Sequence, residues 1–171
     1  MDVTLFMAQS INGYIARENG QEDFLSDKNW KTFQQLAEKT GCFIIGRKTY
    51  DTVMKWKEYN FDNINARCII LSKDQKFKPK PNYEIANSPN HALKKASSLG
   101  FKNALLTGGS VINSAFLKQN LISRIILNIE PYILGKGISL FAEENIQTKL
   151  KLIKTTKISQ NIIQLEYKVL K

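Results

Sequence analysis

The stretch that decides the fold reads ALLTGGSVINSAFL and spans residues 104–117. Its first three residues form an uncharged run typical of a buried strand, and residues 111–117 carry apolar side chains at helical spacing. Two glycines, Gly108 and Gly109, separate these segments. Glycines let a ligand approach the backbone, and the first helical turn has unpaired N–H groups, so the stretch predicts a phosphate or pyrophosphate site. Taken alone, a glycine pair also fits an ordinary tight turn.

The rest of the chain alternates between strand-like and helix-like segments in the same way. Strands are expected at Val3–Ala8, Cys42–Gly46, Arg67–Ser72, Tyr83–Ala86, Asn103–Thr107 and Ser123–Glu130. Helices are expected at Asp27–Lys39, Lys48–Met54, Pro89–Leu99 and Ser110–Lys118. Alternating apolar and polar residues across Lys149–Lys157 and Asn161–Leu170 predict an antiparallel C-terminal hairpin. We therefore expect an α/β fold in one domain over residues 1–171, with three layers: a mixed, mostly parallel sheet and helices on both faces.

Composition and charge limit the classes of function. The 171 residues carry a net charge of +10, and 43% of them are hydrophobic, as in an ordinary globular domain. Lysines supply most of the charge and are dispersed along the chain instead of gathered with aromatic residues, so we expect no nucleic-acid partner. A positive field would nevertheless steer a phosphate-rich cofactor toward the protein.

Membrane spans, disulfides and metal sites are not expected either. No apolar run approaches membrane-spanning length, and the chain enters a strand directly at Asp2 without a signal-peptide pattern, which predicts a cytoplasmic protein without a membrane partner. Cys42 and Cys68 each lie at the start of an apolar strand. We expect both to be buried, reduced thiols that bind no metal.

Five segments carry a resemblance to a known family. They are MAQSINGYIA at residues 7–16, IIGRKTY at 44–50, IILSK at 69–73, the Gly108-Gly109 segment, and PYILGKGISLF at 131–141. In order and spacing, the chain resembles the dihydrofolate-reductase-like superfamily, and within it the reductase domain of riboflavin biosynthesis. The resemblance covers nearly the whole chain. It implies an NADPH-dependent reductase of a small heterocyclic substrate, and a homodimer that forms through strands near the C-terminus.

Ligands of open α/β sheets bind outside the carboxyl ends of parallel strands, and three expected strands end in phosphate-compatible residues. Thr49 can bond a phosphate, and Arg47 with Lys48 can hold further anionic oxygens. The resemblance places Ser72 and Lys73 beside the adenosine 2′-phosphate, and these additional groups favour NADPH over NADH. The cofactor-binding residues expected at the three strand ends are Gly46, Arg47, Lys48, Thr49, Leu71, Ser72, Lys73, Thr107, Gly108, Gly109, Ser110 and Val111.

The loop after the first strand is expected to close the other side of the site. In the family, the residues that match Ala8 and Ile15 contact the nicotinamide through backbone groups, and the turn at Asn12 and Gly13 moves over it. Asparagine and glycine suit such a turn because both tolerate left-handed backbone conformations. The alternative is an ordinary turn between two strands. A mobile loop at this place would exclude water from hydride transfer.

The sequence leaves several proton donors open. Reduction of a C=N bond needs a hydride on one atom and a proton on the other. The resemblance places a catalytic acid in the helix after the first loop, where Asp27 matches if Trp30 is aligned and Asn29 matches if Phe33 is aligned. Asp27 also suits the start of a helix, as a cap or first-turn anion. Asp23 and a held water molecule are the remaining alternatives.

Two departures from the relatives leave the substrate open between a pterin-like and an aminopyrimidine-like ring. The Leu-Pro-Trp that usually follows the first loop in the folate enzyme is absent. The riboflavin-pathway reductase usually carries a glutamate before its paired glycines, whereas Thr107 stands there in this chain. The alternative to an enzyme is a non-catalytic protein of the same fold that binds NADPH or another metabolite.

Overall fold

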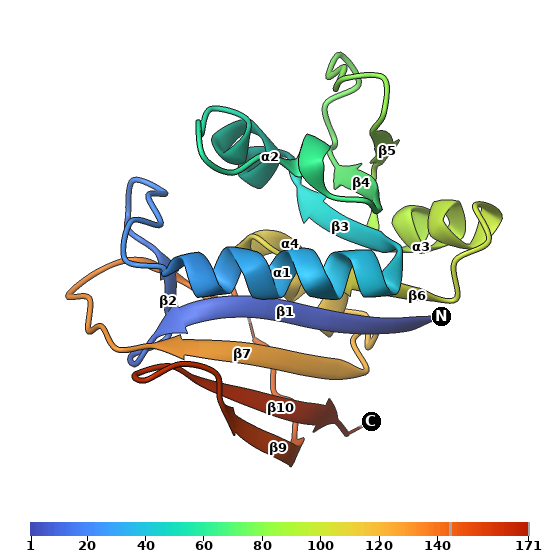
Figure 1. Cartoon of the computed structure of the whole chain (residues 1–171). Coiled ribbons are helices and arrows are strands. Elements are labelled where there is room, and N and C mark those ends of the chain that lie inside the picture. Colours follow the sequence, from blue (N-terminus) through green and yellow to red (C-terminus); the bar gives the residue numbers. More distant parts are fainter. Residues whose placement is uncertain (144, 171) are drawn as a thin grey trace.

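An eight-stranded sheet forms the centre of the computed structural model, which describes residues 1–143 and 145–170 (Figure 1). Its strands are β1 Asp2–Ser10, β3 Cys42–Gly46, β4 Arg67–Leu71, β5 Glu84–Ala86, β6 Asn103–Leu106, β7 Arg124–Glu130, β9 Leu150–Lys157 and β10 Ile163–Val169. They lie in the order β5-β4-β3-β6-β1-β7-β10-β9. The strands from β5 to β7 pair in parallel, whereas β10 is antiparallel to both of its neighbours. The mixed, mostly parallel sheet and the C-terminal hairpin are therefore confirmed.

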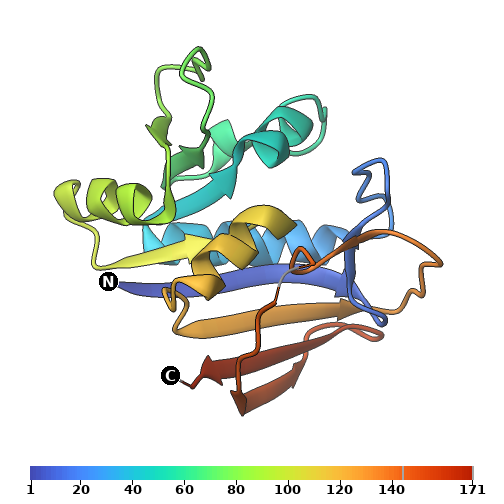
Figure 2. The same ribbon diagram turned by 180° about the vertical axis from the view of Figure 1, so that it is seen from behind.

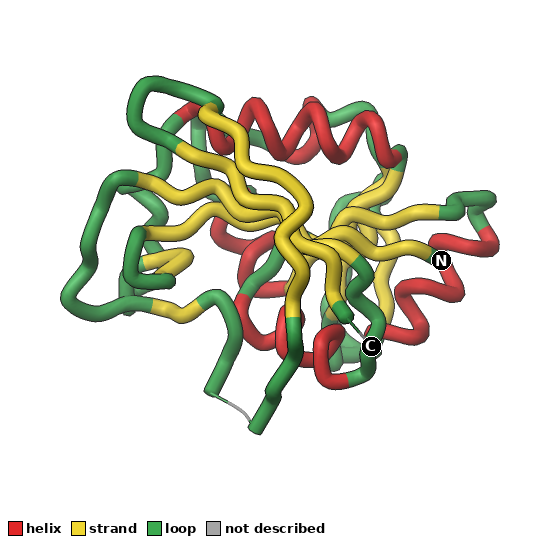
Figure 3. Tube along the Cα trace, turned by 90° about the horizontal axis from the view of Figure 1, so that it is seen from below, coloured by secondary structure: helices red, strands yellow, loops and turns green. Residues whose placement is uncertain are grey.

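Helices cover both faces of this sheet, which completes the expected three layers. The helices are α1 Asp27–Thr40, α2 Arg47–Val53, α3 Pro89–Ser98 and α4 Ser110–Lys118, with a short 3-10 helix η1 at Phe61–Asn63. Helices α1 and α2 pack on one face through Phe33 and Tyr50, and α3 and α4 pack on the other through Ala92 and Phe116. Figure 1 shows α1 in front of the sheet, and Figure 2 shows α4 on the opposite side. Figure 3 shows the strands lying between the helices.

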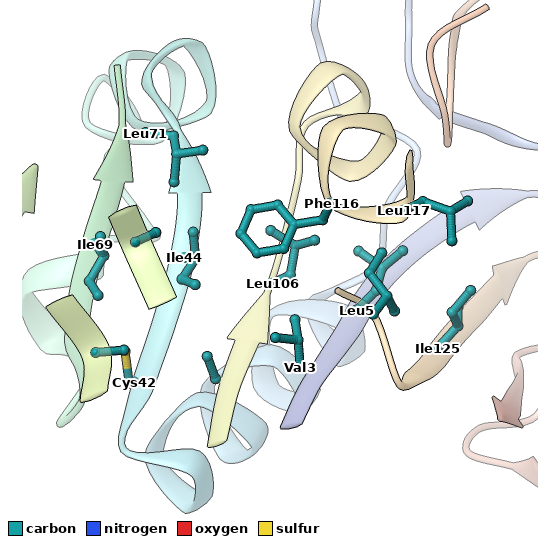
Figure 4. Packing of buried hydrophobic residues seen from close by; sticks show 14 of the residues in the cluster. Val3, Leu5, Cys42, Ile44, Ile69, Leu71, Leu106, Phe116, Leu117 and Ile125 are labelled. Atoms are coloured by element: carbon teal, nitrogen blue, oxygen red, sulfur yellow. The ribbon is translucent and has the colours of Figure 1, made fainter. Parts of the chain in front are cut away.

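The side chain of Phe116 anchors α4 on the sheet. It is fully buried in the cluster that contains Leu5, Ile44 and Leu106. Figure 4 shows its ring pointing from α4 toward the strands that carry these residues. Burial of an aromatic ring of this size is among the largest single contributions to a small core. The position of α4, and of the glycine pair that precedes it, therefore depends on this contact.

A second, two-stranded sheet was not predicted. It pairs β2, Tyr14–Ala16, with β8, Ile138–Ser139, in antiparallel orientation. Strands of this length show no usable periodicity, so sequence patterning could not reveal them. Gly137 permits the pairing, because a Cβ on it would lie 2.5 Å from the Ala16 carbonyl oxygen. The pairing holds the segment that leads to α1 against the segment that follows β7.

Cys42 and Cys68 are buried and free, as expected. Burial raises the pKa of Cys42 to about 12 and that of Cys68 well above its usual range, so both thiols stay protonated at neutral pH. Within the described residues, no helix is long and apolar enough to cross a membrane. The same part of the chain holds no group of three or more His, Cys, Asp or Glu residues that could bind a metal.

Candidate active site

A cavity of about 830 Å³ lies beside the carboxyl-terminal half of β1 and the end of β6. Its wall also includes the loop between β2 and α1, the first turns of α1, and α2 with the loop that follows it. Asp23 and Asp27, two of the acids considered from the sequence, are part of the wall. The predicted cofactor-binding residues that line the cavity are Ala8, Ile15, Thr49, Thr107 and Gly109. The fold thus brings residues from distant segments to one cavity.

The glycines join the ends of β3 and β6 beside the cavity. The N–H of Gly46 donates to the Gly108 carbonyl oxygen at 2.8 Å, and the peptide bond from Gly108 to Gly109 is cis. Gly108 has a φ of +84°, and a Cβ on it would lie 2.9 Å from the sulfur of Met7. A Cβ on Gly109 would lie 3.4 Å from Oγ1 of Thr49. Among the described residues no side chain caps the start of α4, and because the Ile112 and Asn113 N–H groups already donate to the Gly109 carbonyl oxygen, those of Ser110 and Val111 are the ones available to a ligand that enters this narrow cradle.

Arg47 is engaged with other side chains. Its Nε donates to Asp51 at 2.7 Å, its NH1 donates to Asp74 at 3.0 Å, and its guanidinium stacks over Phe77 at 4.2 Å. Hydrogen bonding and Coulomb attraction from Asp51 and Asp74 raise the pKa of Arg47. A phosphate at this strand end would therefore compete with two carboxylates for the guanidinium.

The other predicted residues at these strand ends lie outside the cavity wall. Lys48, Lys73 and Val111 are exposed, whereas Gly46, Leu71, Gly108 and Ser110 are buried. Ser72 is half-buried, and its Oγ accepts a hydrogen bond from the Asp74 N–H at 3.2 Å. Their contacts with a cofactor stay predictions. Within residues 1–143 and 145–170, neither Lys48 nor Lys73 is paired with a carboxylate, so both can bind an additional phosphate directly.

The turn after β1 is fastened to the segment that follows β7. Nδ2 of Asn12 donates to the Leu134 carbonyl oxygen at 2.6 Å, and Oδ1 of Asn12 accepts from the Leu134 N–H at 3.2 Å. The Leu140 N–H donates to the Gly13 carbonyl oxygen at 3.2 Å. Gly13 has a φ of +89°, the left-handed conformation expected for it. Movement of this turn over a ligand would have to break these bonds.

The two aspartates considered as proton donors both have partners. Asp23 forms a two-bond ion pair with Arg17, with N–O distances of 2.6 and 3.0 Å, and the hydrogen bonds from Arg17 lower the pKa of Asp23. A carboxyl with a lowered pKa is a poor proton donor at neutral pH. Asp27 is exposed and accepts a hydrogen bond from the hydroxyl of Tyr59, which raises the pKa of Tyr59 to about 12. Proton donation by Asp27 stays a prediction.

A buried polar chain that sequence reading missed lies next to the cavity. Glu130, at the end of β7, is 1% exposed and accepts hydrogen bonds from the Ser26 hydroxyl at 2.8 Å and from Nδ2 of Asn29. Oδ1 of Asn29 accepts from Nδ2 of Asn128 at 2.6 Å, and Oδ1 of Asn128 accepts from Nε2 of Gln164 at 2.9 Å. Ser26 and Asn29 line the cavity. The sequence signal that could have revealed this chain is the position of Glu130, a charged residue at the end of an otherwise apolar strand.

The carboxylate of Glu130 fixes the orientation of this chain. Its Oε1 also accepts the Ser26 backbone N–H at 3.3 Å, so this oxygen is an acceptor and the Asn29 atom beside it must be the amide nitrogen. The Asn29 oxygen then faces Asn128, whose nitrogen must donate, and the Asn128 oxygen in turn faces Gln164. Asn29 therefore occupies one of the two helix positions considered for the catalytic acid. Its side chain is an amide in a fixed orientation, not a carboxyl group.

Glu22 is a further cavity residue that the sequence did not single out. It lies in the loop between β2 and α1, and it is partly buried in the cavity wall. Burial raises the pKa of Glu22 to about 7, because the protein replaces water around the charged form. Nothing in the local sequence distinguishes it from Glu18 on the same loop, since its burial results from tertiary structure.

Comparisons with known proteins agree with this architecture. The uncharacterized protein YwjB of Bacillus subtilis is 30% identical over 173 residues, which cover 95% of both chains. A pyrimidine reductase-like protein of Corynebacterium diphtheriae superposes with a TM-score of 0.80 at 16% identity, over 99% of this chain and 92% of that one. The diaminohydroxyphosphoribosylaminopyrimidine deaminase/5-amino-6-(5-phosphoribosylamino)uracil reductase of Thermotoga maritima superposes with a TM-score of 0.76 at 18% identity. That match covers 99% of this chain and 56% of the Thermotoga protein.

The family assignment rests on a match to nearly the whole chain. The sequence profile of the RibD C-terminal domain matches residues 2–164, a range that includes every strand and helix described above except the last residues of β10. The resemblance seen in the sequence is thereby confirmed. The chain belongs to the RibD C-terminal domain family, the riboflavin-biosynthesis reductase-like proteins of dihydrofolate-reductase-like fold.

Proposed function

We propose that the protein is an NADPH-dependent reductase that transfers hydride to a small aminopyrimidine-like or pterin-like ring. The observation that carries this proposal is the glycine cradle before α4, which opens at the same cavity as Ala8, Ile15 and Thr49. A cradle for phosphates beside a cavity for a planar ring is the arrangement that a dinucleotide-dependent reductase needs. Membership of a pyrimidine reductase-like family supports the same reaction class.

The residues at the cradle fit the pyrophosphate of such a cofactor. A Cβ at Gly108 would lie 2.9 Å from the Met7 sulfur and one at Gly109 would contact Thr49, so glycines at both positions keep the backbone open to ligand oxygens. The uncapped start of α4 offers N–H groups, and the Thr49 hydroxyl can add a hydrogen bond. When bound, NADPH supplies the hydride. The protein contributes binding, orientation and exclusion of water.

The far wall of the cavity suits a flat ring. Trp30, Trp56, Tyr59 and Phe61 all line it. The ring centroid of Trp30 lies 4.9 Å from that of Tyr59, 5.8 Å from that of Phe61 and 6.5 Å from that of Trp56. Aromatic walls provide large apolar contact areas at little cost in conformational entropy. They favour a heterocycle over an aliphatic substrate.

Titration with NADPH and NADH tests the cofactor proposal. We expect NADPH to bind at least about tenfold more tightly, because a charge-assisted contact with its additional phosphate contributes about 1.5–3 kcal/mol. Nicotinamide fluorescence would report binding. Lys73→Ala should reduce the preference, whereas Lys78→Ala, at an exposed lysine five positions later, should leave it unchanged.

Two outcomes would contradict the proposed enzymatic function. Failure to bind either nucleotide would contradict the cofactor site. Tight binding of NADPH without oxidation in the presence of dihydrofolate, other pterins or the aminopyrimidine of the riboflavin pathway would instead favour the non-catalytic binding protein.

We also propose that two copies of the chain associate through β9 and β10. Within the described residues, β9 forms an edge of the large sheet, and Leu152 and Ile153 on it are 52% and 48% exposed. Exposed apolar residues on an edge strand are typical of strands covered by a partner. Light scattering should give the mass of two chains, and Leu152→Lys should shift it toward one. Leu99→Lys, at an exposed leucine after α3, is the matched control, and a wild-type mass of one chain would rule the dimer out.

A further inference from the structure

Glu22 lines the cavity, and the described part of the chain offers its carboxyl group no partner. It shares the cavity wall with Ala8, Asn29 and Thr107. Within the described residues, no hydrogen bond or ion pair to its carboxyl oxygens is present, whereas Asp23 is held by Arg17. A protein seldom leaves a partly buried carboxyl without a partner unless a ligand or a proton satisfies it.

The other titratable groups around the cavity do not account for the raised pKa of Glu22. Asp23 and Asp27 lie on its own side, and Lys55, Lys57, Glu58 and Tyr59 lie on the loop after α2. None of them contributes to the pKa of Glu22, whose single cause of elevation is burial. A carboxyl that is half protonated near pH 7 can release a proton during turnover and regain one from solvent.

Two of the three positions where relatives would suggest an acid, those of Asn29 and Thr107, do not provide one. Asn29, fixed by Glu130 and Asn128, is an amide and holds no exchangeable acidic proton at neutral pH. Thr107 stands before the glycine pair, and a hydroxyl is too weak an acid to replace a carboxyl. Asp27, the third position, lines the cavity but is exposed and accepts a hydrogen bond from Tyr59, whereas Glu22 is partly buried and has no such partner within the described residues.

We propose that Glu22 is the catalytic proton donor of this site, which rests on the reductase function proposed above. In the balanced step, hydride with its two electrons passes from reduced nicotinamide to the carbon of a substrate C=N bond. The π bond opens, and the nitrogen takes the proton from the Glu22 carboxyl. The products are the amine, the oxidised nicotinamide and the Glu22 carboxylate, which regains a proton from water.

The test is Glu22→Gln, with Glu18→Gln as the matched control on an exposed residue of the same loop. With saturating NADPH and the reducible heterocycle, kcat of Glu22→Gln should fall by about 10²–10⁴-fold while KM changes little. The wild-type kcat should fall as the pH rises above about 7, where Glu22 loses its proton, and the residual rate of Glu22→Gln should lack this limb. Glu18→Gln should behave as wild type.

A carboxyl ¹³C NMR titration of the protein alone decides the point independently of activity. One resonance with a midpoint near 7 should be present in the wild type and absent in Glu22→Gln. An ordinary glutamate midpoint, or full kcat in Glu22→Gln, would overturn the role of Glu22 while the reductase function stands. A wild-type protein that binds NADPH but reduces no heterocycle would overturn the reductase function, and the donor role with it.

Discussion

Replacing Phe116 by alanine should lower the free energy of unfolding by about 3–5 kcal/mol, the usual cost of removing a buried aromatic ring and leaving a cavity. Phe116 is fully buried between α4 and the sheet. Because α4 carries the glycine cradle at its start, the variant should also bind NADPH more weakly even below its melting temperature. Urea unfolding followed by circular dichroism would measure the first effect, and nucleotide titration the second.

Val111→Ala provides the matched control on the same helix. Val111 is 71% exposed, so its truncation should change stability by no more than about 0.5 kcal/mol. Equal losses in the two variants would mean that α4 is not held by its buried face. A stable Phe116→Ala protein would contradict the central place of this ring in the core.

The second large effect is expected for Gly137→Ala. The new Cβ would lie 2.5 Å from the Ala16 carbonyl oxygen and 2.9 Å from Cγ of Tyr14, and the backbone oxygen cannot rotate away. Strands β2 and β8 would have to separate, at a cost of about 1–3 kcal/mol. Because Ile15 on β2 lines the cavity, ligand affinity should fall together with the melting temperature.

Gly135→Ala is the control, since a Cβ built there would have no described atom within 4 Å apart from those of its own residue and its chain neighbours. Differential scanning calorimetry of both variants, with and without NADPH, would separate a general effect of side chains in this loop from the specific clash at Gly137. If both alanines are tolerated equally, β2 and β8 are not held together as closely as the structure shows.

Sequence patterning predicted the large sheet because its parallel strands are buried on both faces. CFIIG at Cys42–Gly46 and NALL at Asn103–Leu106 are nearly uncharged runs, and helices of ordinary length follow them. The glycine junction could be predicted for a similar reason. Its geometry is local, and the residue types alone indicate a close approach to the backbone.

The polar side of the cavity could not be predicted because its contacts are long-range. Asn29, Asn128 and Gln164 come from α1, β7 and β10, and each has the sequence appearance of an ordinary surface amide. Arg47 is comparable: its sequence context suggested a phosphate ligand, but two carboxylates from other positions reach it first. Tertiary structure decides the partners of the amides and the contact of Arg47 with Asp74, whereas the pair of Arg47 with Asp51 is an i,i+4 contact within α2 that helical spacing indicates.

The hydrogen bonds from Glu130 through Asn29 and Asn128 to Gln164 have a single allowed orientation. This orientation affects which tautomer of a heterocyclic ring would fit beside Asn29. Lactam and lactim tautomers of pyrimidines and pterins exchange donor and acceptor positions, with little change in shape. A ring that bound beside Asn29 would meet an amide whose nitrogen and oxygen cannot trade places, because Oε1 of Glu130 acts as the acceptor there. Were a pyrimidine or pterin ring to bind there, Glu130, which does not line the cavity, would favour one of its tautomers without touching it, because Asn29 lines the wall in a single orientation.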